Sequence, residues 1–479
     1  MKRVITETGE VSRASLPRAR ASKQVSVTGF DAIDRRRRLD SASLLGGYGI
    51  GQRIPGALSS EKAPSDTGER YPSPICMSSV GDSLAIFFRR DGETVLAIRG
   101  GQRDVELPLG EYPSAAHGRK RSVSAFNRYS DPLDAVGGRY EKQLLVFPDK
   151  LRIGLDGDEW QVSDMEESSS IPDLERACVH LSRLFGTGED RIWVSAYNEP
   201  ENFELDTATD YGAASAWAST LQSNTRADSP ISAPVLYDGQ LLCFKRNFCH
   251  AINNNKNPFR VADLFCRGAI SAEAIAEAGG RLYFVSDDGI YAYGGGSPER
   301  ISDPLGLRDY GGALLCGAGD TCYIYLPSAH AIYTYSAAVG FGRLALPDGL
   351  RPIALAATDE GAYALSEEGA LWRLSGEQYG EYCFESAYLT LGFDTPWRIE
   401  SVSVTAELGV GAHLTVSART PGGEESRLGE FVGEGGGPRT FHCDSTAAAA
   451  PPDDCHSIVL SGDGDAVVLG LRVRGSAAG

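Results

Sequence analysis

Two adjacent pairs of metal-binding side chains stand near the end of the chain. His442-Cys443 and Cys455-His456 together offer two thiolates and two imidazoles, a ligand set that zinc accepts. However, eleven residues separate the two cysteines, and adjacent Cys-His pairs chelate poorly. The intervening TAAAAPPDD is typical of a hairpin loop between paired strand ends, with a zinc site or a cross-strand disulfide as the less favoured alternatives.

Two acidic, glycine-containing segments suggest calcium at first sight. They are DGD at 156–158 and GDGD at 462–465. Neither carries the alternating oxygen ligands and the distal Glu of a calcium-binding loop. Asp-Gly turns between strands account for both segments, so we expect hairpins there rather than metal sites.

Other patterns that support catalysis also have simpler explanations. The GGG at 294–296 is followed by SPER, whereas a phosphate-binding loop needs a following helix and usually a Lys. No GxSxG motif occurs, and the seven histidines are spread along the chain. Carboxylates are so plentiful that spacing selects no glycosidase pair. We therefore predict no catalytic, cofactor-binding or metal-ligating residues, and no cofactor.

The elements that would position any site come from a repeat in the second half of the chain. The unit at 268–305 predicts four consecutive short strands, with 281–286 and 290–293 as the second and third. Asp287-Asp288-Gly289 predicts the turn between them, because Asp-Gly tolerates positive φ. In 281–286, alternation places Leu282 and Phe284 on one face and Tyr283 and Val285 on the other.

The repeat recurs at a nearly constant step. A glycine precedes the second strand of each unit, at 239, 280, 319 and 361, giving steps of 41, 39 and 42 residues. Strand-like segments at 81–88, 141–153 and 188–197 bring the number of units to about seven, with six as the alternative. Within the first half, 212–224 could form a short helix, and 167–187 is ambiguous between helix and strand.

A β-propeller explains this repeat best. A lone four-stranded meander exposes both faces, whereas radial packing buries them and leaves short edges. An open solenoid would need polar caps, which are not evident. After about 384 the repeat gives way to period-2 alternation. The predicted fold is all-β, with an N-terminal extended arm at 1–70, a propeller of six or seven blades at 71–384 and a β-sandwich at 385–479.

Charge and targeting signals limit the function classes. The net charge of −18 argues against a nucleic-acid binder and against anionic membrane surfaces. The RRRR at 35–38 could contact nucleic acid or an acidic partner, and an arm that docks on a neighbouring subunit is an equal alternative. The N-terminus lacks the apolar core of a secretory signal, and no segment is apolar enough to span a bilayer. We therefore expect synthesis in the cytoplasm.

The ten cysteines show no CxxC pair. In a reducing compartment we expect reduced, mostly buried thiols. In particular, Cys243, Cys266, Cys316 and Cys322 should be unpaired and largely buried, because they lie in or beside apolar strands.

The segments 244–261 and 268–302 resemble propeller-type structural proteins of tailed phages and prophages. Within them, LYFVSDDGIYAYG at 282–294 is similar to a unit that members of this family repeat. Residues 119–150, 190–205 and 462–476 resemble the same group, whereas 1–118 diverges. The resemblance implies a non-catalytic virion protein at the head–tail junction or in the tail, made in the bacterial cytoplasm and acting as a homo-oligomeric ring with other virion proteins.

Two other functions remain alternatives to this one. A glycan-binding adhesin would carry aromatic residues in equivalent loops of several blades, whereas the aromatics here lie mainly on strands. A propeller enzyme, such as a glycosidase or lyase, would gather carboxylates and a His at its central channel.

Overall fold

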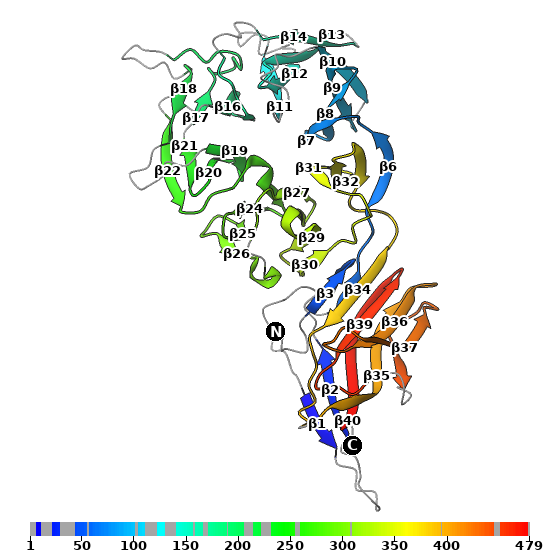
Figure 1. The fold of residues 1–479 in the computed structure, drawn as a ribbon. Helices are drawn as coiled ribbons and strands as arrows, with labels where there is room; N and C mark the ends of the chain where they lie inside the picture. Colours follow the sequence, from blue (N-terminus) through cyan, green and yellow to red (C-terminus); the bar gives the residue numbers. More distant parts are fainter. Residues whose placement is uncertain are drawn as a thin grey trace, which may run out of the picture.

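The computed structural model describes the chain at 6–10, 22–28, 44–54, 57–100, 104–110, 122–129, 140–156, 159–165, 171–188, 190–205, 214–221, 231–253, 259–306, 309–393, 395–444 and 451–477. These residues form antiparallel β-sheets arranged as a ring of blades and a separate sandwich (Figure 1). Within the described ranges, three short 3-10 turns accompany the strands: η2 (Ala272–Ala274), η3 (Asp303–Leu305) and η4 (Pro327–Ala329). No described helix is long and apolar enough to cross a membrane.

The described strands form seven four-stranded blades. Each of the first six is a meander of consecutive strands, running from the inner to the outer edge. The first two blades contain β7 (Pro74–Val80), β8 (Ser83–Arg90), β9 (Glu93–Arg99) and β10 (Val105–Gly110), then β11 (Ser122–Tyr129), β12 (Tyr140–Phe147), β13 (Leu151–Asp156) and β14 (Glu159–Asp164). The third and fourth contain β15 (Arg176–His180), β16 (Arg183–Gly188), β17 (Arg191–Val194) and β18 (Trp217–Ser219), then β19 (Ile231–Tyr237), β20 (Gln240–Lys245), β21 (Cys249–Asn253) and β22 (Arg260–Phe265).

The remaining blades complete the ring. The fifth and sixth contain β23 (Ile275–Ala278), β24 (Arg281–Ser286), β25 (Gly289–Tyr293) and β26 (Glu299–Arg300), then β27 (Leu314–Ala318), β28 (Thr321–Leu326), β29 (Ala331–Ser336) and β30 (Gly340–Arg343). The seventh contains β31 (Pro352–Thr358), β32 (Gly361–Ser366) and β33 (Ala370–Arg373), followed by β6 (Ser65–Arg70) from the N-terminal part of the chain. β31 packs against β7, so the last blade meets the first.

Hydrophobic clusters fill the interfaces between blades. Because side chains alternate between the two faces of a strand, one strand contributes residues to two clusters. On β24, Leu282 and Phe284 pack in the cluster shared with the fourth blade. Tyr283 and Val285 pack in the cluster shared with the sixth. This confirms the predicted division of faces. Each blade buries both faces against neighbours, which is why the ring closes.

The C-terminal part forms a two-sheet sandwich, as predicted. One sheet has the order β3 (Leu44–Tyr48), β34 (Glu381–Ser386), β39 (Ser457–Asp463), β36 (His413–Arg419) and β37 (Glu425–Val432). The other contains β1 (Thr6–Glu10), β2 (Ser22–Thr28), β40 (Ala466–Ala477), β35 (Trp397–Leu408) and β38 (Arg439–Asp444). On β35, alternate residues such as Val402 and Val404 point into the core and are fully buried.

Backbone pairing joins the sandwich to the sixth blade. β4 (Ile50–Gly51) pairs with β30, and β5 (Leu58–Ser60) pairs with both β4 and β40. The sixth blade and one sandwich sheet therefore belong to a single eleven-stranded sheet. In Figure 1 the sandwich lies beneath the ring beside this blade.

The expected extended arm at 1–70 is wrong for the residues described there. β2 pairs with β40, β3 with β34, and β6 with β33. These segments complete sheets in both domains instead of projecting from them. The physical reason is that β33 and β40 have backbone edges that another strand must cover. The run at 35–38 lies outside the described residues.

The predicted turn glycines occupy equivalent places. Gly239, Gly280 and Gly319 lie between the first and second strands of their blades, Gly361 is the first residue of the second strand β32, and all four have positive φ. The expected reason for Gly289 is wrong, because its φ is not positive. A Cβ there would lie 2.7 Å from Nε of Arg300 on the outer strand β26 and 2.7 Å from Oγ of Ser302, so the close approach of these side chains favours the glycine. The expected short helix at 212–224 is also wrong, because β18 lies there.

Candidate functional site

The structure separates the four residues of the less favoured zinc alternative. His442 is exposed on β38 and its Nδ1 lies 2.9 Å from Oγ of Ser403. His456 is fully buried, with its ring edge-on to Trp397 at 4.6 Å between centroids. Among the described residues, no group of three or more His, Cys, Asp or Glu is placed to hold a metal ion.

The hairpin predicted between the two Cys-His pairs is wrong. β38 pairs with β35 in one sheet, whereas β39 pairs with β34 and β36 in the other. The chain therefore crosses between the sheets, which sends the two pairs to different layers. Cys443 and Cys455 are both free thiols.

The two acidic segments lie at hairpins, as predicted. Asp463 ends β39 and Gly464, with φ +86°, turns the chain into β40. Asp465 forms an ion pair with Arg53, so this carboxylate ties the sandwich to the N-terminal part of the chain. Asp156 pairs with Glu159 across the β13–β14 hairpin, whereas 157–158 lie outside the described residues. GGG at 294–296 forms the loop between β25 and β26.

The expectation about four thiols is partly wrong. Cys243, Cys316 and Cys322 are buried, as predicted, on the faces of β20, β27 and β28. Cys266 is exposed, because it follows the outer strand β22 at the rim of the fourth blade. Burial raises the pKa of the Cys316 thiol to about 12.

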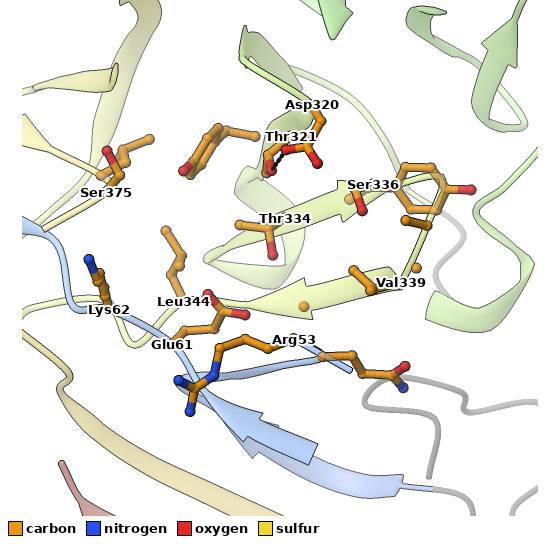
Figure 2. A pocket seen from close by; sticks show the side chains of 17 residues that line it. Arg53, Glu61, Lys62, Asp320, Thr321, Thr334, Ser336, Val339, Leu344 and Ser375 are labelled. Carbon is orange, nitrogen blue, oxygen red and sulfur yellow. Dashed lines mark hydrogen bonds between the residues drawn. The ribbon is translucent and has the colours of Figure 1, made fainter. Parts of the chain in front are cut away.

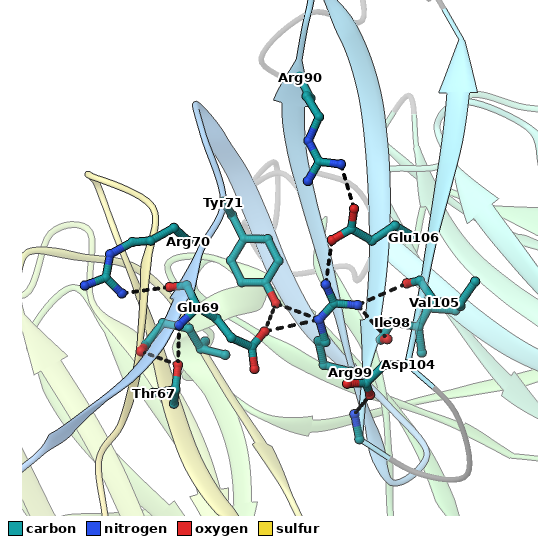
Figure 3. Close-up of polar contacts among 12 residues, drawn as sticks. Thr67, Glu69, Arg70, Tyr71, Arg90, Ile98, Arg99, Asp104, Val105 and Glu106 are labelled. Atoms are coloured by element: carbon teal, nitrogen blue, oxygen red, sulfur yellow. Dashed lines mark hydrogen bonds and ion pairs between the residues drawn. The ribbon is translucent and has the colours of Figure 1, made fainter.

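A polar network fastens the N-terminal strand of the seventh blade to the first blade (Figure 3). Arg99 on β9 donates from Nε to Oε2 of Glu69 at 3.1 Å and to the hydroxyl of Tyr71 at 3.0 Å. Its Nη2 donates to Oε1 of Glu106 on β10 at 2.6 Å. Arg90 on β8 donates to the other oxygen of Glu106 at 2.7 Å. We call these five residues the closure network.

The electrostatics of the closure network match its geometry. The Arg90 and Arg99 hydrogen bonds hold the pKa of Glu106 below its usual value of 4.5, against the effect of partial burial. Burial, together with the hydrogen bond to Glu69, raises the pKa of Tyr71. Tyr71 therefore stays a neutral phenol that donates to the Glu69 carboxylate. The backbone N–H of Tyr71 also bonds the carbonyl of Gly369 at 2.8 Å, so one residue contacts both blades.

Two passages of chain run side by side where the domains meet. Backbone bonds link Ala63 to Gln378 at 3.0 Å and Gly380 to Glu61 at 3.4 Å. Arg53 adds side-chain bonds to the hydroxyl of Tyr379 at 2.9 Å and to the carbonyl of Ala466 at 3.3 Å, besides its ion pair with Asp465. The junction is thus held by backbone pairing and by the guanidinium of Arg53. Arg343 on β30 adds a bond from its Nη1 to the carbonyl of Gly47 on β3 at 3.0 Å.

A cavity of about 450 Å³ lies against this junction (Figure 2). We call it the junction cavity. Its walls come from β28, β29 and β30 of the sixth blade, from the passage before β6 and from the segment after β33. The residues that line it are Gln52, Arg53, Glu61, Lys62, Asp320, Thr321, Tyr323, Thr334, Tyr335, Ser336, Ala338, Val339, Gly340, Gly342, Leu344, Leu374 and Ser375.

Two further hollows, of about 390 and 380 Å³, lie where the turns between second and third strands meet the starts of inner strands. Both are lined by Arg246, Ile270 and Ser271. Ion pairs cross this face of the ring, from Arg246 to Asp287 at 2.9 Å and from Arg176 to Glu273. Basic groups here are therefore already matched by acidic ones from other blades.

Reasoning from the sequence missed the closure network and the junction cavity. Both depend on residues at 1–70, where the sequence predicts an extended arm. The weak signal was the spacing of charged residues in SDTGER, where Asp66 and Arg70 form an ion pair on the exposed strand β6.

The strand order of the described residues defines a seven-bladed β-propeller joined to a β-sandwich. No protein-family model matches the chain, and comparison with curated proteins finds no match. Among solved structures, the extracellular domain of a hybrid two-component system from B. thetaiotaomicron is 10% identical, with a TM-score of 0.40 over 85% of this chain and 60% of that one. This chain thus spans less than two thirds of that protein.

Two other solved structures are similar at the same low level. YCF48 from Cyanidioschyzon merolae is 11% identical, with a TM-score of 0.38 over 65% of this chain and 98% of that one. A glycoside hydrolase family 43 arabinoxylan arabinofuranohydrolase from Bacillus subtilis is 9% identical, with a TM-score of 0.24 over 84% of this chain and 95% of that one. At these scores the similarities carry no argument about function.

Proposed function

We propose that the chain is a non-catalytic structural protein of a phage or prophage particle. It acts in the neck or tail, at the head–tail junction or in stabilising the tail. It is made in the bacterial cytoplasm and enters the virion by assembling as a homo-oligomeric ring with other virion proteins.

The observation that carries the proposal is the continuous sheet from β27 through β30, β4 and β5 to β40. Backbone hydrogen bonds, rather than a flexible linker, join the two domains, and strands from the N-terminal part complete both of them. Such a join fixes the relative position of two large surfaces, as a part of a particle requires. Specific contacts between subunits usually bury about 1,200–2,000 Å². The repeat at 282–294 and the net charge of −18 agree with this role.

The test is whether the chain is part of a particle. Prophage induction in the organism that encodes the chain, followed by density-gradient purification, yields particles for quantitative mass spectrometry. We expect the chain to co-purify in fixed proportion to the capsid protein, and antibody labelling to mark the neck or tail. Recovery of the chain in the free fraction alone would contradict the proposal. Native mass spectrometry of the recombinant chain tests the ring.

A glycan-binding adhesin is the second candidate. The two hollows that share Arg246, Ile270 and Ser271 favour it, because they lie on the face where loops of several blades meet. Binding of surface glycans that disappears on Arg246→Ala, with no chain found in particles, would favour this function instead.

A further inference from the structure

The junction cavity has a polar group without a partner inside it. The Glu61 side chain is partly buried and forms no hydrogen bond or ion pair with the described residues. Burial raises the pKa of this carboxyl, and the nearby Arg53 offsets the effect only in part. A partly buried carboxyl that no described protein donor bonds can accept hydrogen bonds from a ligand with hydroxyl donors.

Glycines keep this space open. A Cβ on Gly51 would lie 1.7 Å from Oε1 of Glu61, so no other residue at 51 is compatible with this position of the carboxyl. A Cβ on Gly342 would lie 2.5 Å from Oγ1 of Thr334. Figure 2 shows the Glu61 and Thr334 side chains pointing toward each other across the cavity.

The rest of the lining offers hydroxyls and balanced charge. Tyr323 remains a neutral phenol because burial raises its pKa to about 12. The Thr321 hydroxyl donates to Oδ1 of Asp320 at 3.1 Å and can still accept. Two carboxylates, from Glu61 and Asp320, and two cations, Arg53 and Lys62, line the cavity, and Arg53 is paired with Asp465 of the sandwich. A small ion of either sign would meet like charge here, whereas a neutral polar molecule would meet both donors and acceptors.

Size and shape narrow the class further. A volume of about 450 Å³ lies at the small end of the range of about 300–1,000 Å³ for ligand pockets. Val339, Leu344 and Leu374 supply apolar contacts among the polar residues that line the cavity, and Figure 2 shows Val339 and Leu344 on opposite sides of it. Such a combination of hydroxyls, a carboxyl and apolar contacts suits a molecule that presents both C–H and hydroxyl groups.

From these features we infer that the junction cavity binds a neutral polyhydroxylated molecule of monosaccharide size, with Glu61 and Thr334 as hydrogen-bonding partners. The inference does not depend on the proposed virion role. A ligand held there contacts the sixth blade, the segment after the seventh and the passage before β6 together. It binds only the assembled junction and stabilises it.

The test is calorimetric titration of the full chain with glucose, galactose, rhamnose, N-acetylglucosamine and glycerol. We expect at least one of these probes to saturate, with a Kd of roughly 0.1–10 mM. Glu61→Gln and Thr334→Val should each weaken binding about five- to tenfold, the loss typical of one hydrogen bond. Glu434→Gln, in an exposed sandwich loop, is the matched control and should bind as the natural chain does. Circular dichroism checks that each variant is folded.

Two further arms complete the experiment. The methyl glycoside of the sugar that binds is titrated next. If it binds, the ligand can be a terminal sugar of a larger glycan; if it does not, the anomeric hydroxyl is needed and the ligand is a free sugar. Either result supports the inference. Titrations with inorganic phosphate and with Ca²⁺ test whether the cavity prefers an uncharged ligand to an ion. No saturation by any polyol up to about 100 mM overturns the inference. Affinity unchanged from that of the natural chain in both Glu61→Gln and Thr334→Val also overturns the inference. Binding of phosphate or Ca²⁺ that depends on Glu61, in place of a polyol, overturns it as well.

Discussion

Arg99 on β9 of the first blade donates to Glu69 on β6 of the seventh blade at 3.1 Å, although 30 residues separate them in sequence. β6 comes from the N-terminal part of the chain and β33 from beyond residue 369. The bond therefore lies at the one place where the described ring is completed by strands distant in sequence. A loss of closure should begin there.

Removing the guanidinium should weaken ring closure. The Arg99 side chain is only 18% exposed and bonds three side chains of the closure network as well as the carbonyls of Ile98 and Val105. We expect Arg99→Met to lower the free energy of unfolding by about 1.5–3 kcal/mol, the range for hydrogen bonds to charged groups. Arg90→Met is the control, because Arg90 is 47% exposed and should cost less than about 1 kcal/mol. Urea unfolding measures both variants. Equal losses of unfolding free energy would show that the contact between the seventh and first blades has no special role.

Replacing Gly369, beside β6, with alanine should lower the free energy of unfolding more than replacing Gly280 with alanine. Gly280 and Gly369 both have positive φ, and a Cβ at Gly280 meets nothing within 4 Å. Gly280→Ala should therefore cost only the backbone strain, roughly 1–2 kcal/mol. A Cβ at Gly369 would lie 2.0 Å from the carbonyl oxygen of Tyr71, so Gly369→Ala must also displace β6. Similar unfolding midpoints for the two variants would contradict this.

Deleting residues 1–40 should destabilise the sandwich and leave the propeller folded. The deletion removes β2, which pairs along β40 from Ser22↔Ser476 to Thr28↔Gly470 and buries Val25. Amide hydrogen exchange should accelerate in β40 and not in β24. Deletion of 1–21, which keeps β2, is the control. Unchanged exchange in β40 after the longer deletion would mean that β2 contributes nothing to the sheet.

Acid should weaken the sandwich through a buried histidine. Desolvation holds the pKa of His456 below its usual value of 6.5, even though its Nε2 bonds the carbonyl of Trp397 at 3.1 Å. The unfolded chain therefore takes up a proton at higher pH than the folded chain does, so stability falls as pH drops below about 6.5. Thermal unfolding between pH 7.5 and 5.5 should show a shallower loss in His456→Gln than in the natural chain. Identical slopes would exclude His456 as the cause.

One thiol should react fast in the folded protein. Cys266 is exposed, whereas Cys243, Cys316 and Cys322 are buried and burial raises the pKa of each. A thiol-reactive dye should therefore label Cys266 before these three, because Cys266 is accessible and burial hinders both access and thiolate formation at the other three. Cys266→Ser should remove that rapid phase, and Cys316→Ser should leave it unchanged. Peptide mapping identifies the labelled residue.

The sequence by itself determined the blades, because their signals are local. A glycine between first and second strands and alternating apolar residues, as in Leu282 to Val285, act within one hairpin. Seven such units must bury their faces against one another, so a ring follows. The alternation of apolar and polar residues on β35 likewise predicts a sandwich strand.

Only the tertiary structure decided how the ring closes and how the domains join. β6 is mostly exposed and carries the polar segment SDTGER, so it has no apolar period to mark it as a strand. Its place depends on the free backbone edge of β33, more than 290 residues later, and on Arg99. The junction cavity likewise combines Glu61 with Thr334 and Ser375. Backbone pairing and long-range polar contacts depend on which edge is left uncovered, and that is settled only when the blades have packed.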